Sequence, residues 1–133
     1  MESHPPSLGR NANAAAARER SSSLSRQWNA VQDAAAAVAM MAGLAPEKPT
    51  PKMRNFAALI RDVDGWRYDL AKNQITDMAA MMQPGLAALL ATNARGQNPT
   101  AAALTLWSEY HAAREAVLGL LPEPGALGPK RSA

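Results

Sequence analysis

The stretch DVDGWRYD, residues 62–69, has the residue types of a calcium-binding loop. Asp62 and Asp64 could supply carboxylate oxygens, and Gly65 stands where such a loop needs its sharp turn. When Gly65 is placed at the sixth position of the loop, however, Ile60 takes the first position and Ala71 the twelfth. Hard cations depend on charged oxygen ligands at both of those positions. The spacing therefore argues against a calcium site.

An ordinary helix explains the same residues better. At about 100° of rotation per residue, the large apolar residues of this region fall on one side of a helix. A loop would have no reason to keep that phase on both sides of Gly65, and one glycine inside a helix costs only about 1 kcal/mol. The pattern predicts a single helix over 51–82, which could bend at Gly65. Its apolar side would carry Phe56, Leu59, Ile60, Val63, Leu70, Met78 and Met81.

The same phase puts polar side chains on the apolar side of two helices. Arg67 and Gln74 fall inside it, and Asp77 lies near its edge. Arg114 falls near the centre of the apolar side of the last helix, close to Tyr110. Because a buried charge is costly unless it is paired, we expect Arg67 or Arg114 to pair with Asp77. Gln74 and Tyr110 would complete this buried polar cluster.

Two other interpretations of these arginines stay open. Their side chains could lie along apolar surface with the charged ends in water. They could also line a ligand pocket or contact a partner protein. A distance of more than about 6 Å between Asp77 and both arginines would exclude the pairing, because opposite charges interact strongly only within that range.

Metal, cofactor and covalent chemistry have little support in the sequence. The chain has two histidines and no cysteine. His111 and Glu115 have the spacing of two metal ligands on one helix, but two ligands do not make a site, and no second acid-rich helix supplies the rest. The glycine of NARGQNP lacks the spacing of a phosphate-binding loop. We therefore expect no metal, no cofactor and no catalytic residue.

The helices that must position these side chains are visible as periodic segments between proline and glycine signals. Thr50 before Pro51, and Asn98 before Pro99, combine a capping residue with a proline in the first turn. Gln83 precedes Pro84, which predicts a helix end. We expect an all-α antiparallel bundle of three main helices with one short helix, as a single domain over 21–121 with flexible tails at 1–20 and 122–133. The predicted helices are 22–42, 51–82, 84–95 and 98–121.

Composition and charge narrow the function classes. The apolar fraction of 47% contains one Phe, two Tyr and three Trp, so an alanine-rich core of closely approaching helices is expected. The net charge of +3 suggests nucleic acid, yet residues 21–121 hold nine basic and eight acidic side chains, interleaved. Lack of cysteine, of a signal peptide and of a long apolar run predicts a cytoplasmic protein that does not bind membranes.

These observations favour a small, non-enzymatic protein that binds a protein partner or itself. The helix predicted over 51–82 exceeds its neighbours in length, so part of it needs another cover. The expected interface contains Trp66, Met78, Met81 and Met82. One alternative is an accessory protein that binds nucleic acid through basic tails. A weaker alternative is an enzyme or ligand binder with a buried pocket around Arg67, Asp77 and Arg114.

Overall fold

The computed structural model describes residues 5–123, with side chains described at Ala16 and from Arg18 onward. The part of the chain that it describes contains helices and no strand, which confirms the predicted all-α bundle. The three long helices, α1, α4 and α5, pack against one another. The helices are α1 (Pro5–Met41), α2 (Pro51–Arg54), α3 (Phe56–Arg61), α4 (Gly65–Ala94) and α5 (Thr100–Leu118).

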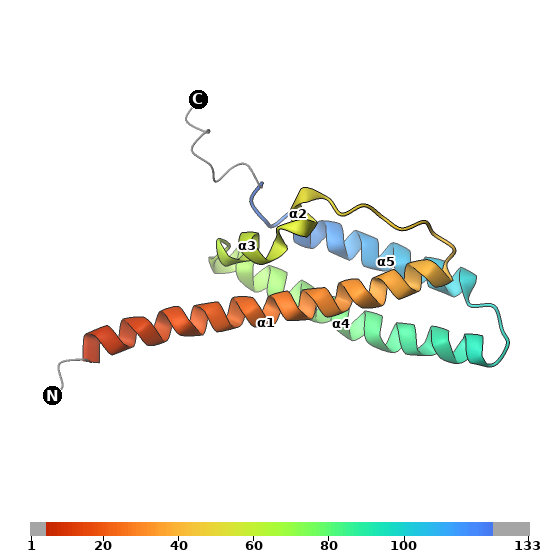
Figure 1. Ribbon diagram of the computed structural model, residues 1–133, viewed down its shortest axis with the longest axis horizontal. Helices are drawn as coiled ribbons and strands as arrows, with labels where there is room; N and C mark the ends of the chain where they lie inside the picture. The colour runs from red at the N-terminus through yellow and green to blue at the C-terminus, as the bar shows by residue number, and fades with distance from the viewer. Residues whose placement is uncertain (1–4, 124–133) are drawn as a thin grey trace, which may run out of the picture.

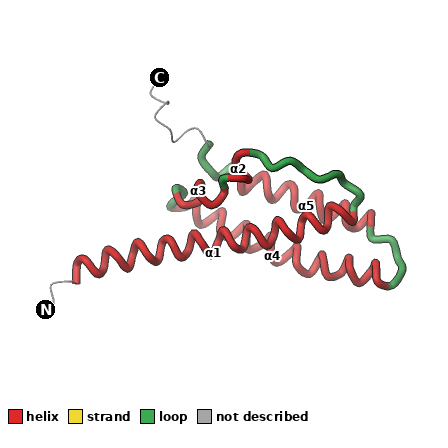
Figure 2. The backbone as a smooth tube through the Cα atoms, viewed as in Figure 1, coloured by secondary structure: helices red, strands yellow, loops and turns green. Residues whose placement is uncertain are grey.

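The directions of the long helices follow from their connections (Figure 1). Residues 42–50 form an extended connector that carries the chain back along the bundle to α2 and α3 (Figure 2). As a result, α4 runs in the same direction as α1 and starts near Arg18 and Ser21 of that helix. The short 95–99 loop then turns α5 back, antiparallel to both. The expected antiparallel arrangement therefore holds for α5 against α1 and α4, while α1 and α4 are parallel.

Helix α1 begins far earlier than its predicted start at residue 22. It includes residues 5–20, for which the sequence suggested a flexible tail. This segment is rich in alanine, the strongest helix former, so it can continue a helix without burying a large apolar side chain. The N-terminal part of α1 extends beyond the other helices (Figure 1). Residues 1–4 and 124–133, which include most of the predicted C-terminal tail but only the start of the predicted N-terminal tail, lie outside the described residues.

The prediction of one helix over 51–82 is wrong. The chain is helical in α2 and α3, leaves the helix at residues 62–64, and starts α4 at Gly65. Asp64 is extended, with φ −139°, and Gly65 has φ +62°, a left-handed conformation that glycine adopts at little steric cost. The predicted helix start is confirmed, because Thr50 Oγ1 accepts a hydrogen bond from the Met53 amide at 3.4 Å.

The predicted helix end at Gln83 is also wrong. Helix α4 continues through Pro84 to Ala94, so the separate helix expected over 84–95 is the last third of α4. An internal proline costs about 3 kcal/mol because it removes one backbone hydrogen bond. Burial of Met82 and Leu89 on either side of the proline offsets that cost. Gly85 also lets the Leu106 side chain of α5 pack against the α4 backbone.

The core lies between α1, α3, α4 and α5. Trp28 of α1 stacks on Phe56 of α3, with ring centroids 4.3 Å apart, which fixes the short helix against the long one. Small buried alanines allow the close helix approach that the composition predicted. The largest fully buried apolar side chains include Val31, Val38, Ile60, Ile75, Met78, Met82 and Val117.

Candidate functional site

The most buried charge of the described chain is Arg114, on the inner side of α5 and 2% exposed. Its Nη1 donates to Glu47 Oε1 at 2.7 Å and its Nη2 to Glu47 Oε2 at 2.8 Å. This is the two-bond geometry in which a guanidinium matches a carboxylate. Its Nε donates to Glu115 Oε2 at 3.3 Å. Glu47 comes from the 42–50 connector, so the pair fastens that connector to α5.

Two aromatic rings surround the same guanidinium. The Arg114 Cζ atom lies 5.5 Å from the centroid of Tyr110 and 5.9 Å from that of Trp107, distances at which a cation is attracted to a ring face. These side chains lie three, four and seven residues apart on α5, so they share one side of the helix. The Tyr110 hydroxyl donates to Gln32 Oε1 on α1. The resulting network joins α1, the connector and α5.

The electrostatics of the network follow from its contacts. The hydrogen bonds from Arg114 hold the pKa of the Glu47 carboxyl below its ordinary value. Its hydrogen bonds to Glu47 raise the pKa of Arg114, so this side chain stays charged at all ordinary pH values. Burial raises the pKa of the Tyr110 hydroxyl, which is therefore neutral and can donate to Gln32. Each group thus has a fixed protonation state at neutral pH.

Only Arg114 and Tyr110 of the predicted polar cluster meet in this network. Asp77 and Arg67 are exposed, and Arg114 pairs with Glu47 in place of Asp77. Gln74 is half-buried, and its Oε1 has no hydrogen-bond partner among the described residues. The error came from the helix phase. The break at 62–64 changes the helix phase after it, so the residues of α4 that face the core include Ala71, Ile75, Met78 and Met82.

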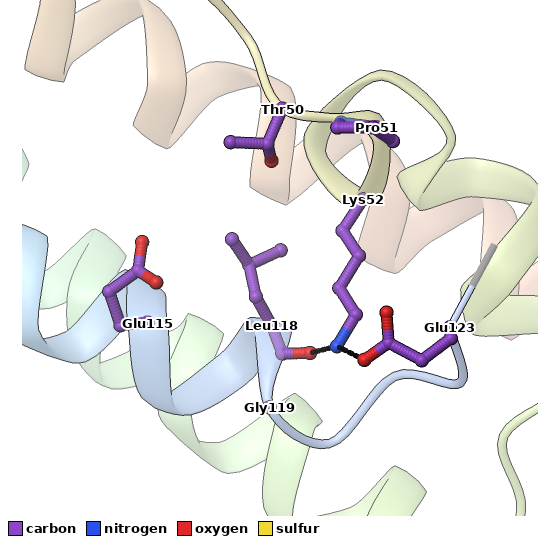
Figure 3. Close-up of a pocket in the computed structure, with 7 residues that line it drawn as sticks. All are labelled: Thr50, Pro51, Lys52, Glu115, Leu118, Gly119 and Glu123. Atoms are coloured by element: carbon purple, nitrogen blue, oxygen red, sulfur yellow. Dashed lines mark hydrogen bonds and ion pairs between the residues drawn. The ribbon is translucent and has the colours of Figure 1, made fainter.

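A hollow of about 570 Å³ lies beside the network, where α2 meets the end of α5 (Figure 3). Lys52 Nζ donates to the Leu118 carbonyl at 3.0 Å and lies 3.1 Å from Glu123 Oε2. A cation at the last carbonyls of a helix is favourable because the helix dipole places negative charge there. The ammonium group of Lys52 therefore has a structural task, joining α2 to the C-terminal end of α5.

The first turns of α4 carry an exposed apolar surface. Trp66 is 65% exposed and Leu70 is 38% exposed, four residues later on the same side of the helix. The Cζ atom of Arg67 lies 5.0 Å from the centroid of the Trp66 ring. We call these three residues the Trp66 face. Next to it, Arg67, Asp62 and Asp64 line a groove of about 340 Å³ together with residues 119–122.

The methionines of the predicted interface do not extend this face. Met78 and Met82 are fully buried in the core, and Met81 is half-buried against it. An interface containing Met78 and Met82 is therefore wrong for the folded chain. They fill the core, which is the common use of methionine in a helical bundle. Trp66 is the one predicted interface residue with most of its side chain in solvent.

The described residues offer little support for metal binding or for a membrane-spanning helix. His111 Nε2 lies 3.9 Å from Glu115 Oε2 at the surface. Within residues 5–123, no three histidine, aspartate or glutamate side chains gather in the way that a metal ion needs. In the same part of the chain, none of the helices has both the length and the apolar character required to cross a bilayer.

Comparison with known protein families, with curated proteins and with solved structures gives no match to this chain. The function therefore has to be argued from the geometry of the bundle alone. The sequence did not predict that Glu47 pairs with Arg114, or that Gln32 accepts a hydrogen bond from Tyr110. Glu47 lies in a proline-rich connector, where no periodicity marks a residue as facing the bundle.

Proposed function

We propose that this protein is a non-enzymatic interaction module that associates with a second copy of itself through the Trp66 face. The observation that carries the proposal is the 65% exposure of Trp66 beside Leu70. A single exposed apolar residue needs no explanation, but a Trp and a Leu on one side of a helix form a patch that water solvates poorly. Tryptophan and arginine are also the residues that contribute most to protein interfaces.

The charges near the Trp66 face favour a second copy as the partner. The adjacent groove contains the cation Arg67 and the anions Asp62 and Asp64. In a dimer with twofold symmetry, the same surface is used by both copies, so it must be complementary to itself. A surface with an apolar centre and both signs of charge at its edge meets that condition. Arg67 of each copy would then face the aspartates of the other.

An enzymatic function has less support. The guanidinium of Arg114 is enclosed by Glu47, Glu115, Tyr110 and Trp107, and Glu47 occupies both of its terminal nitrogens. This leaves little donor capacity for a substrate. For the nucleic-acid alternative, residues 5–20 of the predicted N-terminal tail are part of α1, and the basic residues Lys130 and Arg131 of the C-terminal tail lie outside the described residues. We place the protein in the cytoplasm, because a chain without cysteine gains nothing from an oxidising compartment.

Sedimentation equilibrium over a wide concentration range tests the proposal. The average mass of the wild-type protein should rise above 14.1 kDa toward twice that value. Replacement of the interfacial Trp66 in Trp66→Ser should weaken the association by roughly 2 kcal/mol, which is about 30-fold in the dissociation constant.

Met40→Ser is the matched control. Met40 is 78% exposed and lies at the C-terminal end of α1, so this change also removes an exposed apolar side chain but leaves the Trp66 face intact. The control should associate as the wild type does. A strictly monomeric wild-type protein, or equal association of wild type and Trp66→Ser, would show that the proposed function is wrong.

A further inference from the structure

A groove of about 310 Å³, lined mainly by polar residues, lies between α1 and α3 and contains no residue of the Trp66 face. On α1, Arg18, Ser22, Ser25 and Asn29 recur at steps of three and four residues, which places them on one side of the helix. On α3, Arg61 faces the same space. The charged and hydroxyl side chains that line the groove are Arg18, Arg26, Arg61, Ser21, Ser22 and Ser25.

The groove contains three cations and no carboxylate. Asn29 and Ala57 are its other lining residues, and the carboxylates that lie near it, Asp64 and Asp69, line the adjoining hollow that Arg18 and Arg61 share. Within residues 18–123, the cations of the ion pairs are Lys52, His111 and Arg114, and none of them lies in the groove. Three exposed arginines along one small groove concentrate positive charge there. An anion between them would offset that charge.

Hydroxyl groups lie among the arginines. Ser22 and Ser25 are accessible on the same side of α1, while Ser21 is only 8% exposed and lies where this groove meets a neighbouring hollow. Guanidinium groups bind tetrahedral oxyanions with two parallel hydrogen bonds, and serine hydroxyls donate to the remaining oxygens. The lining therefore has the chemistry of a phosphate site.

We propose that this groove binds the phosphate group of a small phosphomonoester. A volume of about 310 Å³ is near the lower limit for small-molecule sites, which is large enough for a phosphate and a few further atoms. An extended nucleic-acid strand fits less well, because carboxylates lie at the borders of the groove. Asp64 and Asp69 line the adjoining hollow, and Asp33 follows Asn29 one turn along α1. They would repel a continuous polyanion.

Isothermal titration calorimetry with O-phosphoserine and with inorganic phosphate, at constant ionic strength set with chloride, tests the proposal. The wild-type protein should bind O-phosphoserine at one saturable site with a millimolar or lower dissociation constant. Arg18→Gln and Arg61→Gln should each weaken binding by about 10-fold or more, because each removes charged donors to the phosphate. Arg95→Gln, which changes an exposed arginine of the α4–α5 turn, should bind as the wild type does.

Amide NMR shifts distinguish a local site from general anion binding. Titration with O-phosphoserine should shift signals at Ser21–Asn29 and at Arg61, and because Arg18 and Arg61 are exposed, their variants should keep the wild-type spectrum without ligand. Absence of saturable binding would overturn the proposal. So would equal losses in Arg95→Gln, shifts confined to other helices, or binding of a single-stranded oligonucleotide without binding of O-phosphoserine.

Discussion

Arg114 and Glu47 are 67 residues apart in the chain and form two parallel hydrogen bonds, at 2.7 and 2.8 Å. The arginine is buried, whereas the Glu47 side chain is 40% exposed. The pair therefore lies at the boundary of the core, with the connector folded over the guanidinium. This contact fastens the connector to α5, and the connector returns the chain so that α4 runs parallel to α1.

Removal of Glu47 should destabilise the bundle. Glu47→Ala leaves the guanidinium of Arg114 buried without its main partner, and breaking a fully buried pair costs about 3–5 kcal/mol. Because Glu47 is partly in solvent, we expect a smaller loss of roughly 1–3 kcal/mol in the free energy of unfolding, measured by urea denaturation. Glu123→Ala is the control, since the Glu123 side chain is 75% exposed in its pair with Lys52, and its effect should stay below about 0.5 kcal/mol. Equal effects of the two changes would contradict the role of the pair.

The same pair predicts a dependence of stability on acid. The pKa of Glu47 in the folded protein lies below its ordinary value of 4.5. The folded state therefore binds this proton more weakly than the unfolded state, so the stabilisation is complete above about pH 5 and is lost as pH falls through the lowered pKa. The difference in unfolding free energy between wild type and Glu47→Gln should shrink between about pH 5 and pH 3. A difference that does not change with pH in this range would count against the assignment.

The hydrogen bond between Tyr110 and Gln32 should show the cost of an unpaired buried group. Tyr110→Phe keeps the ring but leaves Gln32 Oε1 without its donor, which should cost about 1–2 kcal/mol. Nε2 of Gln32 already has no partner among the described residues. Adding Gln32→Leu should therefore restore part of the loss, because both polar groups are then absent. Additive losses in a double-mutant cycle of urea midpoints would argue against a direct contact.

The substitution Gly65→Ala distinguishes one continuous helix over 51–82 from a helix that starts at Gly65. In one continuous helix, Gly65→Ala would stabilise the protein by about 1 kcal/mol. At the observed φ of +62°, alanine is strained, and a Cβ atom there would meet no other atom within 4 Å that could compensate. We therefore expect a loss of roughly 1–2 kcal/mol in the unfolding free energy. The sign of the change in urea midpoint decides between the two descriptions.

Sequence patterns predicted the helical class and the burial of Phe56, Leu59, Ile60, Val63 and Met78, because apolar residues at steps of three and four indicate the buried side of a helix. These patterns gave wrong helix boundaries where the apolar periodicity and a glycine or proline signal disagreed. The small cost of a glycine inside a helix predicted that the helix continues through Gly65, and the proline predicted that it ends before Pro84. The structure shows the opposite at both positions. The outcome depends on which arrangement buries Val63, Met82 and Leu89 against other helices. Such contacts between distant segments are not visible in a local pattern.

The candidate sites show the same limit. The pattern indicated Arg114 and Tyr110 because they lie on an apolar stripe, and Trp66 because the helix predicted over 51–82 exceeded its neighbours in length and needed another cover. The role of Glu47 could not be predicted, because a residue in an irregular connector belongs to no periodic pattern that would indicate which side faces the core. The sequence also did not predict the groove between α1 and α3. Arg18 and Arg61 are far apart in the chain and come together only through the packing of α3 on α1.

The most direct test of self-association through the Trp66 face uses two charge-reversal variants, measured alone and mixed. In a symmetric dimer, Arg67→Asp would place like charges opposite Asp62, and Asp62→Arg would place like charges opposite Arg67. Each variant alone should sediment as a monomer, and the equimolar mixture should form a heterodimer in which the charges are again opposite. If the wild type is monomeric at every concentration, or if each variant alone reaches the wild-type mass, the central claim is contradicted.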